Sequence, residues 1–350
     1  MAAPHSQGGG RIGWIDATRA LGAIAIVVLH VLVSTTIAFD IGSLREVLYA
    51  TVGIIGCRWA VPAFFMLTGY LMLDSSRVVN IQYALRHVRR MLLVILIFGL
   101  TFALMEEVWV RISLGEALDP FVVVLAIGDV LTMQTWDHMW FVYALLGVYM
   151  FMPLVCLIRE RFGQKVFARM TMGLFALVLV VPTLLGTTVA EGPISSFFWN
   201  IAIGVTCACV GGCLDKWELS PAWIAIGAGS ALVMVMVSVT GIGSGAGDQG
   251  YVFLQGSCFA SLYAIMILLL IRRIVGNESL STDGVLSGLA SDSFGIYLVH
   301  PIFIHLGIIA VQSATLVPVL YEVVFSALTL VASIALTRLL RYVPVVRDLL

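Results

Sequence analysis

The stretch WIDATRALGAIAIVVLHVLVSTTIA, residues Trp14–Ala38, decides the fold class of this chain. Its apolar run from Ala20 to Ala38 is about as long as a bilayer core is thick, because a helix needs roughly 20 residues to cross the hydrocarbon. No small-residue cleavage site closes the run, so we interpret it as an uncleaved first transmembrane helix rather than a signal peptide. The preceding residues 1–10 are polar and Gly-rich, which predicts a disordered cytosolic N-terminus.

The rest of the chain has the composition of a membrane protein. Of its 350 residues, 61% are hydrophobic and 11% are charged, whereas an ordinary soluble domain has about 25% charged residues. No soluble core of this size could bury so much apolar surface. The sequence therefore predicts an all-α, polytopic membrane helical bundle of about ten transmembrane helices. Nine further apolar segments follow the first: Val47–Leu73, Met91–Val110, Met139–Ile158, Val166–Thr187, Phe198–Leu214, Trp223–Val239, Val252–Ile271, Leu289–Val311 and Val317–Leu340.

The charges of the loops alternate along the chain and predict its orientation. Basic residues precede the first span, fill the second, fourth and eighth loops and close the chain, whereas the intervening loops are mostly acidic. The positive-inside rule then places both termini in the cytosol and requires an even number of spans, as expected for a multi-pass protein of the inner cell membrane. One more apolar stretch, Phe121–Val130, is too short to cross and predicts a re-entrant or interfacial piece on the outer side.

Composition also argues against two classes of partner. The net charge of −1 gives no support for nucleic-acid binding. The spacing CxCxxxC at Cys207, Cys209 and Cys213 has no histidine nearby, so it predicts small residues packing in a membrane helix rather than a metal site. The six cysteines all lie in apolar stretches, and we expect no disulfide framework.

Polar side chains in the middle of a membrane are costly, so each one suggests a function. Arg19 and His30 are 11 positions apart in the first span, which returns them to one helical stripe about 16 Å apart along the axis. Arg19 is then at the cytosolic face and His30 near the bilayer centre. This arrangement suits a long ligand with a charged end at the surface and a reactive end at depth.

Other spans carry polar residues at matching depths. His300 is predicted at about the depth of His30, and Tyr297 lies one turn below it on the same face. Farther out, Arg58 and Glu106 or Glu107 could form an ion pair that neutralises the cost of burying either partner. His138 and Trp140 begin the fourth span at the outer interface, and His305 lies at a comparable depth.

Structural explanations remain open for each of these residues. A histidine in mid-membrane can simply bond a neighbouring helix, and Arg58 can belong to a structural ion pair. Trp140 can serve as an interfacial anchor. The cluster formed by Arg86, His87, Arg89 and Arg90 can be no more than the charge that sets the topology.

Five motifs follow one another along the chain: RIGWIDATRALGAIAIVVLH (Arg11–His30), RWAVPAFFMLTGYLM (Arg58–Met72), RHVR (Arg86–Arg89), HMWFVYALLGVYMFMPL (His138–Leu154) and SFGIYLVHPIF (Ser293–Phe303). In this order they resemble the acyltransferase-3 family of integral membrane acyltransferases over nearly the whole chain. The resemblance implies one transmembrane domain, residues 11–342, followed by a cytosolic tail, residues 343–350. The fourth span lacks the WSLxxEExFY form of many larger relatives, so the chain is most similar to the compact subgroup that includes the enterobacterial common antigen O-acetyltransferase.

The resemblance implies an acyl-coenzyme A donor, usually acetyl and sometimes succinyl, and a cell-surface carbohydrate as the usual acceptor. It implies that His30 is the catalytic histidine with Arg19 as its partner, and that Arg86 and Arg89 bind the donor. We expect Arg90 to join this pair. No metal is expected.

Together these observations predict a membrane-bound O-acetyltransferase. Coenzyme A would dock from the cytosol with its phosphates on the guanidinium groups of Arg86, Arg89 and Arg19, and its arm would carry the thioester up to His30. The hydroxyl of a surface or lipid-linked glycan would enter from outside past His138 and Trp140, with Arg58 and Glu106 as further substrate-binding residues.

His30 would act as general base on the acceptor hydroxyl, with Tyr297 or His300 as candidate oxyanion stabilisers. Two alternatives stay open. One is a transporter or flippase of a polysaccharide or lipid-linked precursor that uses the buried histidines as proton relays. The other is a structural scaffold, which leaves the intramembrane charges unexplained.

Overall fold

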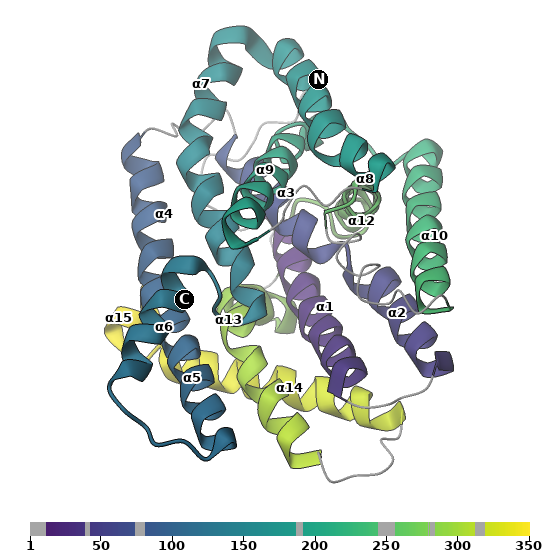
Figure 1. Cartoon of the computed structure of the whole chain (residues 1–350). Helices are drawn as coiled ribbons and strands as arrows, with labels where there is room; N and C mark the ends of the chain where they lie inside the picture. The colour runs from purple at the N-terminus through teal and green to yellow at the C-terminus, as the bar shows by residue number, and fades with distance from the viewer. Residues whose placement is uncertain are drawn as a thin grey trace.

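The computed structural model describes residues 12–38, 43–73, 81–186, 192–243, 256–278, 280, 284–311 and 319–350. Within these ranges every regular element is a helix, as the apolar segments predict (Figure 1). The first predicted segment forms α1 (Gly13–Ala38), whose Asp16 lies in the first turn. The N-terminus predicted to be disordered, residues 1–10, lies outside the described residues.

The helices follow the predicted segments closely. The second span is broken at Arg58 and Trp59 into two helices, and the third continues α4 through a π-helical turn into α5. The stretch predicted to be too short to cross becomes α6 (Phe121–Thr132), which packs against α5. The helices after α1 are α2 (Ser43–Cys57), α3 (Ala60–Met72), α4 (Ile81–Val94), α5 (Leu100–Leu114), α6 (Phe121–Thr132), α7 (Trp140–Phe175), α8 (Val181–Leu185), α9 (Pro193–Gly211), α10 (Pro221–Gly243), α12 (Cys258–Val275), α13 (Val285–Val311), α14 (Val319–Leu340) and α15 (Pro344–Arg347).

Nine segments of the described chain are long and apolar enough to cross a membrane. One of them, Phe121–Leu185, has 65 residues, which is about three times the length that a single crossing requires. It includes two of the predicted spans. They are separated at Gly163, where the backbone leaves the helical region (φ 77°, ψ 165°) and α7 folds back on itself. Figure 1 shows α7 running to this bend and returning toward α8.

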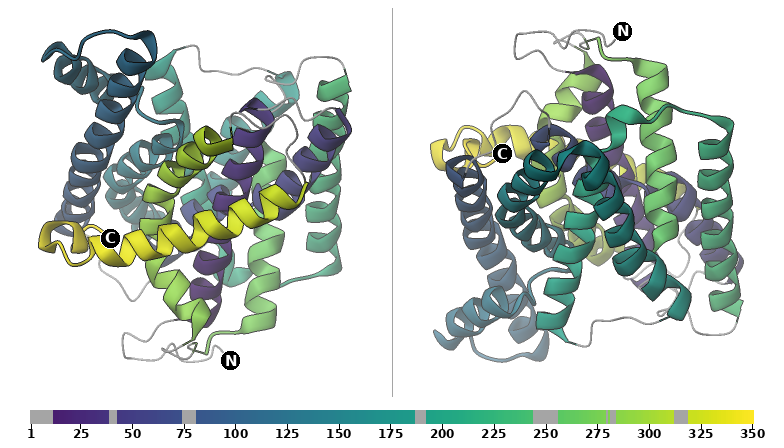
Figure 2. Two further views of the ribbon diagram at one scale, coloured as in Figure 1. Left: turned by 90° about the horizontal axis from the view of Figure 1, so that it is seen from below. Right: turned by 90° about the horizontal axis from the view of Figure 1, so that it is seen from above.

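The core of the bundle is built around α1. This helix packs most extensively on α13 and also contacts α2, α3, α12 and α14. The contact is close because small side chains, Ala20 and Ala23 on α1 and Ala290 on α13, lie between the two helices. Figure 2 shows α14 crossing one face of the bundle and ending beside α15 near the C-terminus.

A second close contact joins α3 to α9. A Cβ atom on Gly69 would lie 1.8 Å from the backbone oxygen of Ala208, and one on Gly211 would lie 1.9 Å from that of Met66. The two backbones therefore touch directly, in the way that small residues permit between membrane helices. All six cysteines are buried free thiols, as their apolar surroundings predict.

We expect Gly69→Ala to destabilise the protein, because its methyl group would force α3 away from α9. Overpacking of this kind costs about 1–3 kcal/mol, which unfolding of the purified protein in detergent would measure. Gly229→Ala on α10 is the matched control, since nothing lies within 4 Å of the added Cβ. Equal loss in both variants, or none in Gly69→Ala, would contradict the close packing of α3 on α9.

Candidate active site

Three histidines from separate parts of the chain meet inside the bundle. His30 comes from the middle of α1, His300 from α13, and His138 from the 3-10 turn Asp137–Met139 that precedes α7. Nε2 of His300 lies 3.2 Å from Nδ1 of His30, and the rings of His138 and His300 are 5.6 Å apart between centroids. The structure thus brings together two histidines that the sequence places only at a similar depth, and it adds the third.

The hydrogen bonds of the cluster define which nitrogens carry protons in the neutral rings. A carbonyl oxygen can only accept. Nδ1 of His30 lies 2.9 Å from the oxygen of Ile26, and Nδ1 of His300 lies 2.7 Å from that of Tyr297. Both rings therefore carry their proton on Nδ1, and the single Nδ1–H of His30 is shared between two acceptors, the oxygen of Ile26 and Nε2 of His300. Nε2 of His30 is left with its lone pair and can act as a base.

Aromatic and polar side chains surround the cluster on the predicted outer side. The Tyr297 hydroxyl donates to the backbone oxygen of His138, and Nε2 of His138 donates to the oxygen of Leu298 at 3.3 Å. Trp136 stacks between Phe102 and His305, with centroid distances of 4.6 and 4.4 Å. This stack joins α5, the turn before α7 and α13 in one wall.

Polar groups stand at the exposed edge of that wall. Nε1 of Trp136 donates to Glu106 at 3.1 Å, and the side chains of Glu106, Asp137 and His305 are exposed. Trp140 is half-buried and meets the ring of Phe141 edge to face at 6.2 Å. Trp136 and Asp137 are not among the site residues predicted from the sequence, although both directly precede His138.

A cavity of about 670 Å³ opens on the opposite side of the cluster, a size typical of sites for small ligands. Its walls come from α1, α3, α4, α7 and α13. Ile26 and Tyr297 mark its deep end, one turn before His30 and His300 on their helices. Arg19 and Arg90 contribute positive charge nearer the predicted cytosolic face, beside the buried Asp16.

The basic residues of α4 differ in whether they line the cavity. Arg90 and His87 line it, and His87 stacks on Tyr149 with centroids 4.7 Å apart. Arg86 and Arg89 are exposed and do not line it, although Arg86 Cζ lies 5.7 Å from the centroid of Tyr83, a ring in the cavity wall. Helical periodicity places positions 83, 87 and 90 on one face, but it does not separate Arg86, which is only about 40° from Arg90 around the helix.

Arg58 lies at the break between α2 and α3 and is 7% exposed. Together with Leu29, Leu32 and Val33 of α1 it lines a small gap next to the helical turn that holds His30. The pairing of Arg58 with Glu106 or Glu107 stays a prediction.

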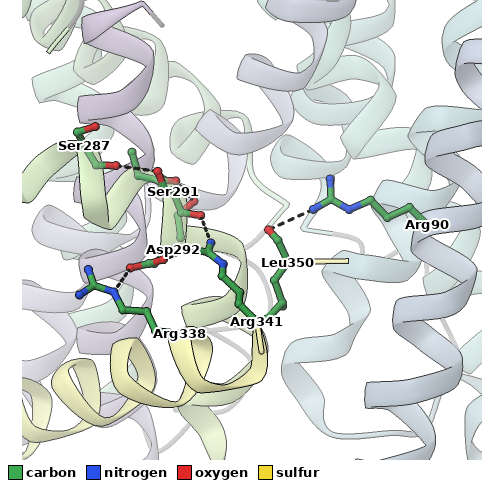
Figure 3. Close-up of polar contacts among 9 residues, drawn as sticks. Arg90, Ser287, Ser291, Asp292, Arg338, Arg341 and Leu350 are labelled. Atoms are coloured by element: carbon green, nitrogen blue, oxygen red, sulfur yellow. Dashed lines mark hydrogen bonds and ion pairs between the residues drawn. The ribbon is translucent and has the colours of Figure 1, made fainter. Parts of the chain in front are cut away.

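Two clusters of hydrogen bonds lie near the C-terminus (Figure 3). Asp292 of α13 is 2% exposed and accepts from Nε of Arg338 at 2.9 Å and from Nη1 of Arg341 at 2.6 Å. Arg90 donates to the backbone oxygen of Leu349 from Nε at 3.0 Å and from Nη2 at 2.8 Å. The segment predicted as a tail therefore docks on α4, and Leu350 lines the cavity.

Asp292→Ala should release the end of α14, because both arginines lose a buried acceptor. Charged hydrogen bonds of this kind contribute about 1.5–3 kcal/mol each. We expect a lower unfolding temperature in detergent and faster trypsin cleavage at Arg341. The control is Asp348→Ala, whose carboxylate is 75% exposed and pairs with Arg347 at 3.5 Å. Unchanged cleavage and stability in Asp292→Ala would show that Asp292 does not hold α14.

The fold and the site together define a polytopic membrane protein in which a cavity ends one helical turn before a cluster of three histidines. Among the described residues, no group of three or more His, Cys, Asp or Glu side chains is arranged to hold a metal ion. The sequence profile of the acyltransferase-3 family, described as an acyltransferase domain, matches residues 12–338. The chain belongs to this family and is a membrane acyltransferase. No curated protein and no solved structure matches the chain.

Proposed function

We propose that this protein transfers an acetyl group from cytosolic acetyl-coenzyme A to a hydroxyl of an extracytoplasmic or lipid-linked glycan. One observation carries the proposal: a cavity with arginines near its mouth ends one turn before a histidine whose Nε2 keeps a lone pair. The family supports the general reaction, acyl transfer. The cavity supports a long donor with an anionic end, and the exposed polar rim around Trp136 supports a polyhydroxylated acceptor.

The donor's phosphates bind the cations at the predicted cytosolic face. Arg19 and Arg90 reach them from the cavity wall, and Arg86 and Arg89 attract them from the exposed face of α4. Guanidinium groups suit this task because their charge is permanent and their donors form a fork. The pantetheine arm then runs along α1 from Arg19 toward His30.

The transfer step needs a base beside the thioester. Nε2 of His30 accepts the proton of the acceptor hydroxyl, and the oxygen attacks the thioester carbonyl carbon. The carbon–sulfur bond breaks, the acyl group stays on the acceptor oxygen, and the departing sulfur takes the proton from His30 as free thiol. His300 is a positioning residue, since its Nε2 accepts from His30 Nδ1 and keeps the lone pair on the reactive nitrogen.

The stabiliser of the developing oxyanion must bring a proton or a positive charge. The Tyr297 hydroxyl donates to His138, and His300 donates its Nδ1 proton to the Tyr297 carbonyl, so both groups hold the cluster together. Arg58 supplies charge next to His30 from a buried position, where electrostatic stabilisation is strongest. His138 and Trp140 line the path that the acceptor takes to His30, and Glu106 binds at its rim.

His30→Ala should abolish acetylation and leave donor binding intact, because the base is lost but the cations remain. Loss of a general base costs about 10²–10⁴-fold in rate. Mass spectrometry of surface glycans from cells producing either protein measures the modification, and calorimetry with coenzyme A measures donor affinity. The mechanism is wrong if the folded variant still acetylates its target at the native rate.

Substitution of the arginines inside the cavity should weaken donor binding more than substitution of the exposed arginines. Arg19→Ala and Arg90→Ala remove charged contacts inside the cavity and should weaken coenzyme A binding about 10–100-fold. Arg86→Ala and Arg89→Ala remove exposed charges, so we expect about two- to fivefold, with strong dependence on salt. Arg169→Ala, an exposed arginine on the returning half of α7, is the control. Equal effects of all five variants would contradict a donor site in the cavity.

A further inference from the structure

We propose that Phe64 and Phe141, together with Tyr297, form the acyl pocket and restrict the donor to short acyl groups. The inference rests on the proposed function, since it takes the coenzyme A arm to lie in the large cavity. It concerns the deep end of that cavity, where the group to be transferred must sit.

The deep end lies directly before the histidines. The last residue of α1 that lines the cavity is Ile26, whose carbonyl oxygen is bonded by His30. On α13 the corresponding residue is Tyr297, whose carbonyl oxygen is bonded by His300. A thioester that reaches Nε2 of His30 therefore places its acyl chain among the side chains at this level.

Three aromatic rings from three helices narrow the cavity at its deep end. Phe141 of α7 lies 5.3 Å from the ring of Tyr297 and 6.3 Å from that of Phe64, each at a steep angle (64° and 62°). All three side chains line the cavity. Edge-to-face contacts of this kind hold aromatic rings in defined positions.

Neither phenyl ring has room to retreat. Phe64 lies against the bare backbone of α1 at Gly22, where an added Cβ would come within 2.9 Å of the ring. Phe141 is backed by Phe65, which is 0% exposed, at a centroid distance of 4.7 Å. Densely packed side chains resist added volume. The space for the acyl chain is therefore limited by the rings themselves.

This arrangement predicts discrimination by chain length. In a closed apolar pocket one methylene group changes affinity or rate about 10–200-fold. An acetyl group adds one carbon beyond the carbonyl carbon, whereas a butanoyl or octanoyl chain must displace a ring. We infer that acetyl fits and that longer chains are rejected.

The test uses the purified full-length protein and three thioethers of coenzyme A, the S-ethyl, S-butyl and S-octyl compounds. They present chains of different length and cannot be turned over, so no acceptor is needed. Calorimetry should give wild-type affinities for S-butyl and S-octyl that are at least about tenfold weaker than for S-ethyl. Phe141→Ala and Phe64→Ala should bring S-butyl to within about threefold of S-ethyl.

Two further variants keep the outcome interpretable. Phe198→Ala removes a phenyl ring that is 64% exposed on α9 and should leave the order of affinities unchanged. Phe141→Leu keeps an apolar side chain if the alanine variant does not fold, and should improve S-butyl binding part of the way.

Three results would overturn the inference. Wild-type protein could bind S-octyl as tightly as S-ethyl, or the phenylalanine variants could keep the wild-type order. Either result would contradict the proposed acyl pocket without contradicting the proposed function. Failure of unsubstituted coenzyme A and all three thioethers to bind would overturn the proposed function and this inference together.

Discussion

The contact between α1 and α13 is the constraint on which the site depends. Alanines on both helices let their backbones approach closely, and this approach places His30 3.2 Å from His300. In a membrane interior an imidazole proton without an acceptor is costly. Each ring donates its Nδ1 proton to a backbone carbonyl oxygen of its own helix. The same bonds that make the histidines tolerable in lipid therefore determine which nitrogen is free to react.

The helices around this pair give its two sides different chemistry. Toward the predicted cytosol, the cavity combines arginines near its mouth with aromatic and aliphatic walls at depth. Toward the predicted exterior, a stack built on Trp136 carries exposed carboxylates and an exposed histidine. Phe141 and Tyr297 lie between the two sides. Separation of this kind suits a reaction whose thioester must be shielded from water until the acceptor hydroxyl arrives.

The sequence predicts depth well and rotation poorly. The rise per residue places His30 and His300 at one level, and the apolar runs locate the spans, because both depend on one helix at a time. Which side chains meet depends on how each helix is rotated about its axis relative to its neighbours. A single amino-acid sequence does not contain that information. The basic residues of α4 illustrate the difference, since Arg90 and His87 line the cavity whereas Arg86 and Arg89 do not. The bend of α7 at Gly163, in contrast, agrees with the prediction of two separate apolar segments, Met139–Ile158 and Val166–Thr187, on its two sides.

The arginines near the C-terminus differ in the groups that they bond, and this difference bears on donor capture. Arg338 and Arg341 both bond the single carboxylate of Asp292, which offsets one of their two positive charges. Arg90 instead bonds the backbone oxygen of Leu349, and its Nη2 also lies 3.4 Å from an oxygen of Leu350. These bonds orient its guanidinium beside the cavity, which Leu350 also lines. A phosphate forms a stronger, charge-assisted bond than a peptide carbonyl does. A phosphate at Arg90 must therefore replace the oxygens of Leu349 and Leu350, whereas one approaching Arg338 or Arg341 must compete with the carboxylate of Asp292.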